Sequence, residues 1–241
     1  MIIIPIPSRR FDPDLLEMMD RPGIDEKLLQ EDLRNLRMIN RFFGGYAAIR
    51  KAVKPLFQCF PKDRQITIFD LATGSADLPI VMSKLAKKLG RSVTITAVDK
   101  NPVMLQVARE LSKDCGEIKI VEGDILDLQC SDKSFDIVVC SLALHHFSRE
   151  NAVRILRNMQ RLARVALVVH DLCRSWTGAW IAWLYTHLTT RNPLTLHDSY
   201  LSVLRSFTLK ELTAMAREAG ITNFTLTKHP FFRMVMVAKL K

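Results

Sequence analysis

Residues 66–79 read ITIFDLATGSADLP and decide the fold. The apolar run is typical of a buried strand, and the small residues that follow it predict a tight turn into a helix beginning near Asp77. Such a turn brings bare backbone close to a ligand at the carboxyl edge of a parallel sheet, where the start of a helix favours a carboxylate or a phosphate. We therefore expect this turn to bind a cofactor. The residues expected to do so are Asp70, Ala72, Thr73 and Gly74.

Two later strand ends carry acids that suit a nucleoside. Strand 93–99 ends at Asp99, which follows the first turn by about 20–30 residues, where a carboxylate that binds ribose usually falls. The strand at 118–123 leads into Asp124 and Ile125. The carboxylate of Asp124 can accept a hydrogen bond from an adenine amino group while Ile125 packs on the base. These ends, in register with the first turn, favour a cofactor that contains a nucleoside.

Strands and helices alternate through the rest of the core. Near-continuous apolar strands joined by helices indicate a parallel sheet with both faces covered. The last two strands are separated by only a few residues, which forces an antiparallel pair. We therefore expect an α/β fold with a mostly parallel seven-stranded sheet and an antiparallel last strand. The expected strands are 66–72, 93–99, 118–123, 135–140, 164–170, 222–227 and 232–240, and the expected helices between them are 77–89, 102–113, 149–162 and 208–220.

The chain divides into an arm and a main domain. Residues 1–60 are expected to cover the cofactor site, with an extended start followed by two runs of helical periodicity that Gly44 and Gly45 separate. Residues 61–241 are expected to form the cofactor-binding domain. Within it, residues 174–206 are too long for a simple connection, so we expect a lid or a binding insertion there.

All three tryptophans of the chain lie in the insertion at 174–206. Three interpretations remain open. The aromatic residues can pack a lid helix on the core, form the wall of a pocket for an aromatic or long-chain substrate, or place a helix at a membrane surface. The apolar stretch is too short to cross a bilayer. Its large apolar residues are Trp176, Trp180, Ile181, Trp183, Leu184, Tyr185 and Leu188.

Four histidines are candidate catalytic residues. His145 and His146 follow the fourth strand, beside the expected switch point of the sheet. His170 ends the fifth strand at the same edge, and His197 lies in the insertion. Imidazole titrates near neutrality, so each can take a proton or position a substrate; a buried structural histidine is the alternative. We expect no metal site, because adjacent histidines do not easily converge on one ion and no carboxylate partner is evident.

Composition limits the classes of partner and compartment. The 241 residues, 48% of them hydrophobic, suffice for one domain with an appendage. The net charge of +10 suits a solvated basic surface, an acidic substrate, an anionic membrane or nucleic acid, of which nucleic acid is the weakest because the basic residues form no dense run. Five dispersed cysteines without a Cys-x-x-Cys pair indicate reduced thiols. With no signal-peptide pattern at the start, we expect a cytoplasmic protein.

These segments resemble the motifs of class I S-adenosylmethionine-dependent methyltransferases, most closely the quinone-biosynthesis enzymes and the small-molecule methyltransferases around them. Residues 70–78 (DLATGSADL) resemble the first motif of that family, and residues 99–105 (DKNPVML) resemble the second. Residues 134–147 are similar to its fourth-strand motif. Residues 40–45 resemble the helical arm that closes over the cofactor.

The resemblance implies a Rossmann-like methyltransferase fold and S-adenosylmethionine as the cofactor. The methionine tail would run along residues 72–74, with Ser141 near the sulfonium. The chain departs from the family at residues 161–164, where a Pro-Gly-Gly turn is usual, at residues 170–171, and in the aromatic insertion. The residues implied near the adenosyl group are Asp99, Lys100, Asp124 and Ile125.

The expected reaction is in-line displacement at the sulfonium methyl, which depends mostly on holding the two reactants close together. We expect a small, hydrophobic aromatic, polyketide-like or quinone-like acceptor, with O-methylation favoured over C-methylation. Two alternatives remain. A nicotinamide-dependent oxidoreductase shares the topology but would have glycines where Ala72 and Ala76 stand. An RNA methyltransferase would explain the charge but lacks an Asn/Asp-Pro-Pro-aromatic motif after the fourth strand. A non-catalytic interaction protein would need a blocked cleft.

Overall fold

The protein is described here from a computed structural model that covers residues 6–12, 17–21 and 23–240. Residues 1–5, the apolar start on which the argument about a signal peptide depends, lie outside the described residues. No helix in the described ranges has the length and apolar character needed to span a membrane.

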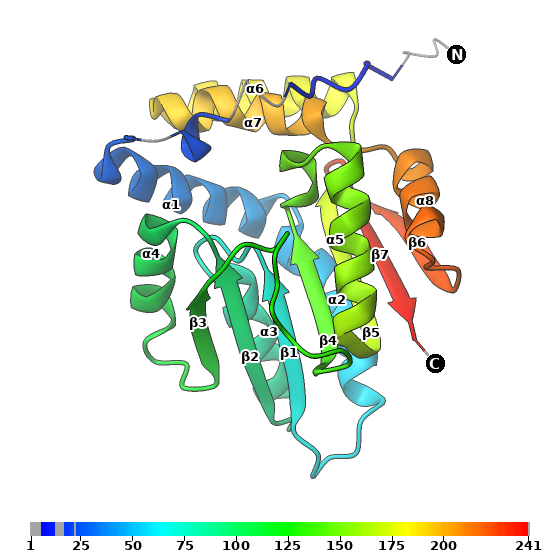
Figure 1. Cartoon of the computed structure of the whole chain (residues 1–241). Coiled ribbons are helices and arrows are strands. Elements are labelled where there is room, and N and C mark those ends of the chain that lie inside the picture. Colours follow the sequence, from blue (N-terminus) through cyan, green and yellow to red (C-terminus); the bar gives the residue numbers. More distant parts are fainter. Residues whose placement is uncertain (1–5, 13–16, 22, 241) are drawn as a thin grey trace.

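A seven-stranded sheet forms the centre of the molecule, in the order β3-β2-β1-β4-β5-β7-β6 (Figure 1). β7 runs antiparallel to β5 and β6, whereas the other neighbouring pairs are parallel. The predicted mostly parallel sheet with an antiparallel last strand is therefore confirmed. The strands are β1 (Ile66–Leu71), β2 (Val93–Asp99), β3 (Ile118–Glu122), β4 (Phe135–Ser141), β5 (Ala163–Leu172), β6 (Phe224–His229) and β7 (Arg233–Lys239).

The order of the strands reverses between β1 and β4. From β1 the chain builds outward to β2 and β3 and then returns to β4 on the other side of β1. The connections diverge at that point, which leaves a crevice at the carboxyl ends of the strands where ligands bind in open α/β sheets. Asp70 near the end of β1 and Ser141 at the end of β4 both stand at this crevice.

Helices cover both faces of the sheet, as the apolar strands require (Figure 1). On one face, α2 (Gly45–Gln58) and α3 (Asp77–Lys88) pack over a cluster that includes the fully buried Phe57 and Met82. On the other face, α5 (Arg149–Leu162) and α8 (Leu209–Glu218) pack over a cluster that includes Leu156 and Leu212. Burying a side chain of this size stabilises the fold by about 1.5–3 kcal/mol.

Local capping signals place the helix ends where the sequence predicts them. The side chain of Asn101 accepts hydrogen bonds from the amides of Val103 and Met104, and so caps α4 (Pro102–Ser112). Thr208 and Glu211 form a reciprocal capping box at the start of α8. These bonds satisfy amides that would otherwise lack partners at the helix starts.

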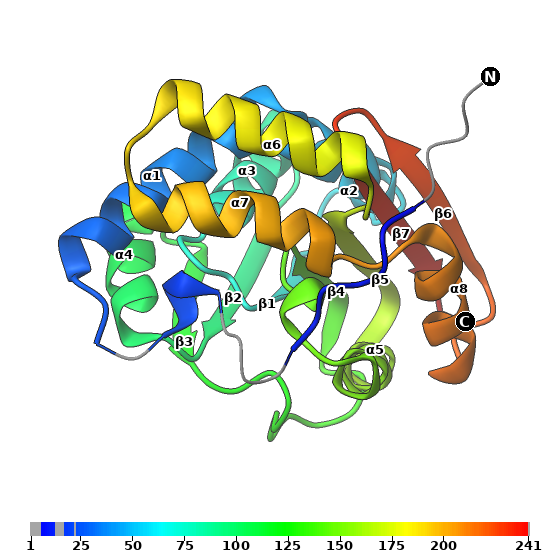
Figure 2. The same ribbon diagram turned by 90° about the horizontal axis from the view of Figure 1, so that it is seen from above.

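Three helices lie across the carboxyl ends of the strands (Figure 2). They are α1 (Glu26–Phe42) from the arm, and α6 (Trp176–Thr189) and α7 (Pro193–Arg205), which together form the insertion at 174–206. Polar contacts tie α7 to α1: Thr195 Oγ1 donates to Asp32 Oδ1 at 2.6 Å, and Asn192 Nδ2 donates to the carbonyl of Leu28 at 2.9 Å. The insertion is thus fixed to the arm as well as to the sheet.

The N-terminal segment is less extended than its composition suggests. Residues 18–20 form a 3₁₀ turn, η1 (Met18–Asp20), because the Asp198 carboxylate accepts from the amides of Met18 and Met19 at 2.8 and 2.9 Å. Farther upstream, the Arg9 guanidinium donates to the carbonyls of His145 and Phe147 at 3.2 and 2.7 Å. The segment therefore braces the loop that follows β4.

Candidate functional site

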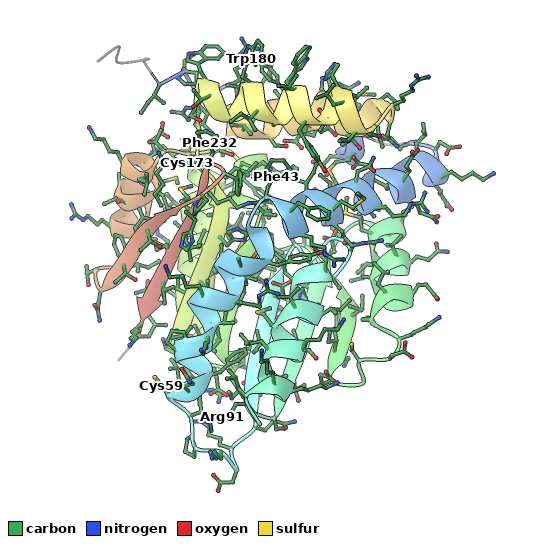
Figure 3. The ribbon with its side chains drawn as sticks, turned by 180° about the vertical axis from the view of Figure 1, so that it is seen from behind. Phe43, Cys59, Arg91, Cys173, Trp180 and Phe232 are labelled. Atoms are coloured by element: carbon green, nitrogen blue, oxygen red, sulfur yellow. The ribbon has the colours of Figure 1, made fainter. Side chains whose placement is uncertain are left out.

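A cavity of about 210 Å³ lies where β1, β4 and β5 end, under the insertion. Residues 70–75 after β1 form one side, and Ser141 and Leu142 after β4 form another. The roof is mainly apolar and comes from α1, α6 and the loop before β7 (Figure 3). In that roof the ring of Phe43 packs edge to face with Tyr185, with centroids 4.5 Å apart. The cavity therefore joins the predicted cofactor turn to the insertion.

The turn after β1 is built from residues in the left-handed backbone region. Ala72, Gly74 and Ala76 have φ of 53°, 55° and 57°. Alanine adopts this region at a cost of about 1–2 kcal/mol, so the fold tolerates alanine where a dinucleotide fingerprint has glycine. At Gly74 an added Cβ would meet no atom within 4 Å, which leaves open space beside the backbone for a ligand.

Two buried polar groups face this space. Burial raises the pKa of Asp70 to about 7, and the nearby carboxylates of Asp77 and Asp99 add to the shift. The hydroxyl of Ser141 is buried and has no hydrogen-bond partner among the described residues. Buried polar atoms normally have partners, so an unpartnered hydroxyl at a cavity indicates a place for a ligand or water.

The structure places the remaining predicted cofactor residues along the adjoining edge, outside the cavity lining. Asp99 joins the two regions, because its carboxylate accepts from the amides of Gly74 at 2.8 Å and Asn101 at 3.0 Å. Lys100 and Asp124 are exposed, and Ile125 is buried in the core.

Beside the cavity, Glu17, His145 and His146 form what we call the His-His-Glu cluster. His145 Nδ1 lies 2.6 Å from Asp171 Oδ1, and His146 Nδ1 lies 2.8 Å from Asp20 Oδ2. The two Nε2 atoms face the carboxylate of Glu17 at 4.0 and 3.9 Å. All three members line the cavity. The cluster is a polar end to a mostly apolar space.

The cluster attracts positive charge. Burial lowers the pKa of His146, but the carboxylates of Glu17 and Asp20 together outweigh that effect and raise it to about 9. Burial likewise raises the pKa of Asp171, but the His145 imidazole holds it below its usual value. His146 therefore keeps its proton at neutral pH in the free chain and cannot take another.

Two predicted histidines do not reach the cavity. His170 is fully buried, and neither ring nitrogen has a hydrogen-bond partner in the described part of the chain. Burial lowers its pKa to about 3 with help from Arg233. It is thus a neutral histidine packed in the sheet. His197 is partly exposed on α7, with Nδ1 at 2.7 Å from Asp198 Oδ1. Neither lines the cavity with His145 and His146.

The arrangement of the two histidines differs from the one assumed when no metal site was expected. Their rings are tilted by 34° with centroids 4.4 Å apart, and both point one nitrogen toward Glu17. The carboxylate comes from a segment far away in the sequence. No local pattern around residue 17 indicates this role.

Arg233 is another site residue that the sequence analysis missed. It is 2% exposed, and its guanidinium donates to the carbonyl of Phe43 at 2.7 Å and to Asn40 Oδ1 at 3.1 Å. The remaining nitrogen, Nη1, is buried and has no partner within residues 6–12, 17–21 and 23–240, and the side chain lines the cavity. Burial lowers its pKa to about 10, offset in part by Asp171 and Asp77. A charged residue at the start of an apolar strand is the only signal that could have found it.

A family model and a curated relative both indicate a methyltransferase. Residues 68–165 match the family model of a methyltransferase domain. The chain is 28% identical over 176 residues to the demethylmenaquinone methyltransferase of Thermotoga maritima, which covers 68% of this chain and 72% of the relative.

Solved structures share the fold. A SAM-dependent methyltransferase from Aquifex aeolicus superposes with a TM-score of 0.58 at 15% identity, over 96% of this chain and all of that one. Magnesium protoporphyrin IX methyltransferase from Synechocystis PCC 6803, solved with bound SAH, gives a TM-score of 0.58 at 16% identity, over 92% of this chain and 90% of that one.

The alternative of a nicotinamide-dependent oxidoreductase is therefore wrong, and the cofactor is S-adenosylmethionine. The chain is a methyltransferase with S-adenosylmethionine as its cofactor, and it resembles the class I enzymes of the quinone-biosynthesis group.

Proposed function

We propose that this enzyme methylates a small hydrophobic acceptor at a hydroxyl oxygen. One observation carries the proposal: a single cavity joins the cofactor turn, an apolar roof and the His-His-Glu cluster. The methyl donor and an apolar acceptor can therefore meet in this cavity, with polar groups beside the reacting atom of the acceptor.

The residues present suit the cofactor. Asp70 can attract the positive charges of S-adenosylmethionine, and the unpartnered Ser141 hydroxyl can bond to it near the sulfonium. The Nη1 group of Arg233 can donate to the carboxylate of the methionine tail. We propose that Ala72, Thr73 and Gly74 line this tail. The residues proposed to hold adenosine are Asp99, Lys100, Asp124 and Ile125.

In the proposed reaction the acceptor oxygen forms a bond to the methyl carbon while the carbon–sulfur bond breaks. The electron pair of that bond stays on sulfur, which gives S-adenosylhomocysteine, and the hydroxyl proton is released to solvent. Positioning at near-attack distance supplies most of the acceleration. The His-His-Glu cluster favours the deprotonated acceptor, with His145 held in orientation by Asp171.

The acceptor class follows from the cavity lining and from the relative. Apolar residues from α1 and the insertion, among them Leu33, Ile39, Phe43 and Ile181, surround the space next to the cofactor turn. By its name, the Thermotoga maritima relative methylates demethylmenaquinone, a quinone. A hydroxyaromatic or polyketide-like molecule with an apolar tail fits such a lining.

A pair of acceptors tests this proposal. We expect methyl transfer to a hydroxyaromatic compound with an alkyl tail to exceed transfer to the same compound without the tail by at least about tenfold in kcat/KM, because each buried CH₂ contributes about 0.8 kcal/mol. Mass spectrometry of the product assigns the methyl group to oxygen or carbon. Equal rates with both compounds, or preferred methylation of an RNA transcript, would contradict the proposal.

We also propose that the insertion docks on an anionic membrane surface. The outer face of α6 exposes Trp180 (63%), Leu188 (77%) and Leu184 (42%), and Trp180 points away from the body of the protein (Figure 3). Exposed arginines, Arg10 and Arg191, flank this helix. An apolar face with flanking cations suits lipid headgroups of negative charge. We further propose that residues 1–60 form an arm over the cofactor site and that residues 61–241 form the cofactor-binding domain. We also propose that the protein is located in the cytoplasm.

Tryptophan fluorescence measures this docking directly, since all three tryptophans lie on α6. We expect a blue shift with vesicles that contain phosphatidylglycerol and a smaller one with phosphatidylcholine alone. A Leu184→Ser/Leu188→Ser variant should lose most of the binding in vesicle sedimentation, whereas Leu111→Ser, an exposed leucine on α4, should keep it. Unchanged emission with both vesicle types would refute the docking.

A further inference from the structure

We propose that Glu17, His145 and His146 bind one divalent transition-metal ion at the polar end of the cavity. The geometry of the three side chains supports binding of the ion, whereas the part of the ion in the reaction rests on the proposed function. Two histidines and one carboxylate are a common donor set for catalytic zinc and for non-haem iron, and both kinds of site keep positions open for a substrate.

The donor atoms face one another across a gap. One nitrogen from each ring and a carboxylate oxygen all lie within 4.8 Å of one another. The Nε2–O distances of 4.0 and 3.9 Å are too long for hydrogen bonds, so these groups do not satisfy each other directly. Around a tetrahedral ion such atoms stand about 3.4 Å apart, so the side chains need to close by only about 1 Å.

Each proposed ligand is already oriented by a second group. Asp171 accepts at Nδ1 of His145, and Asp20 pairs with Nδ1 of His146, so each Nε2 faces the gap. Binding of an ion would displace the proton that His146 carries in the free chain. The Ser202 hydroxyl donates to Glu17 Oε2 at 2.9 Å. Histidines that bind metals usually donate their other ring N–H to a carboxylate or carbonyl, because this fixes the tautomer and the ring plane.

The carboxylate supplies a second, independent observation. Glu17 is 1% exposed, and its Oε1 has no hydrogen-bond partner among the described residues. An unpaired oxygen of a buried carboxylate is costly unless a cation or donor fills the gap in front of it. Here that gap is the one that both imidazole nitrogens face.

An ion in this position would suit the proposed acceptor. The cavity reaches the cluster, so a hydroxyl of the acceptor can approach an open coordination position. A bound cation lowers the pKa of such a hydroxyl, which favours the nucleophilic form near neutral pH. The chemistry would then need no free imidazole as the base.

Cobalt(II) is the test probe, because its visible absorption reports coordination by the protein independently of catalysis. The chain is stripped with a chelator, dialysed and titrated with Co²⁺, and Zn²⁺ is then added as a competitor. We expect one Co²⁺ per chain with absorption in the visible range that Zn²⁺ abolishes. Glu17→Ala, His145→Ala and His146→Ala should each lose this signal. Asp171→Asn and Asp20→Asn should weaken the affinity about 10–100-fold.

Controls separate this inference from the proposed function. His229→Ala removes a histidine on β6 outside the cavity lining and should bind Co²⁺ like the parent. Binding of S-adenosylhomocysteine by calorimetry checks that each variant is folded. If the stripped parent shows no stoichiometric Co²⁺ spectrum and still methylates its acceptor in chelator, the metal inference is overturned and the proposed function stands. If metal binds but no acceptor is methylated, the proposed function fails alone.

Discussion

Replacing His145 with alanine is expected to lower kcat for methyl transfer by about 10²–10⁴-fold, because His145 belongs to the cluster proposed to favour the deprotonated acceptor. His145 faces the cavity, its Nδ1 is held by Asp171 at 2.6 Å, and its main-chain N–H also donates to Asp171. Among the described residues, no hydrogen bond or ion pair joins its side chain to the cofactor turn. The affinity for S-adenosylhomocysteine should therefore stay within about twofold of the parent.

Steady-state kinetics and calorimetry on the same preparations test this separation. His229→Ala is the matched control, since it removes an imidazole outside the cavity, and should keep both values. A His145→Ala variant that loses cofactor affinity as strongly as kcat would show that the residue supports the fold of the loop after β4. A variant with undiminished kcat would remove the cluster from the reaction.

Cofactor affinity is expected to fall by up to about tenfold per pH unit below pH 7, through Asp70. Burial raises the pKa of Asp70 to about 7 in the free chain, so this group becomes protonated just below neutrality. The positive sulfonium and ammonium groups of S-adenosylmethionine favour the ionised carboxylate, so the bound state has a lower pKa. Acidification therefore opposes binding, and a rise in pH above 7 adds little.

Calorimetric titrations from pH 5.5 to pH 8 compare the parent with Asp70→Asn. Asparagine keeps the shape but has no proton to gain, so its affinity should be lower at pH 8 and nearly flat across the range. Histidines titrate in both proteins, and the difference between the two curves isolates Asp70. A parent curve as flat as that of the variant would place the cofactor's charges away from this carboxylate.

The fold was predictable because its signals are local. The pattern of residues 66–79 predicts a strand, a turn and a helix start within one short stretch. The structure has β1, the turn and α3 in those places. Asn101-Pro102 and Thr208-Glu211 mark helix starts through contacts between near neighbours. The short link between β6 and β7 permits only an antiparallel pair.

The cofactor side of the site follows the same logic. Asp70, Gly74 and Asp99 stand at ends of neighbouring parallel strands, and strand alternation alone brings such ends to one edge. The sequence could not predict that the Asp99 carboxylate accepts from backbone amides, or that His170 is fully buried. Those outcomes depend on which face of a strand each side chain occupies after the sheet is packed.

The sequence by itself determined the sheet, the helices around it and the turn proposed to bind the methyl donor, because short-range periodicity and capping encode them. Only the tertiary structure decided the acceptor side. Glu17 and Asp20 from the N-terminal arm, the histidines after β4 and Arg233 from the last strand meet at one cavity, although no local pattern links them. These residues come together because α1, α6 and α7 pack across the strand ends. Such packing joins residues far apart in the sequence, so no local sequence pattern predicts it.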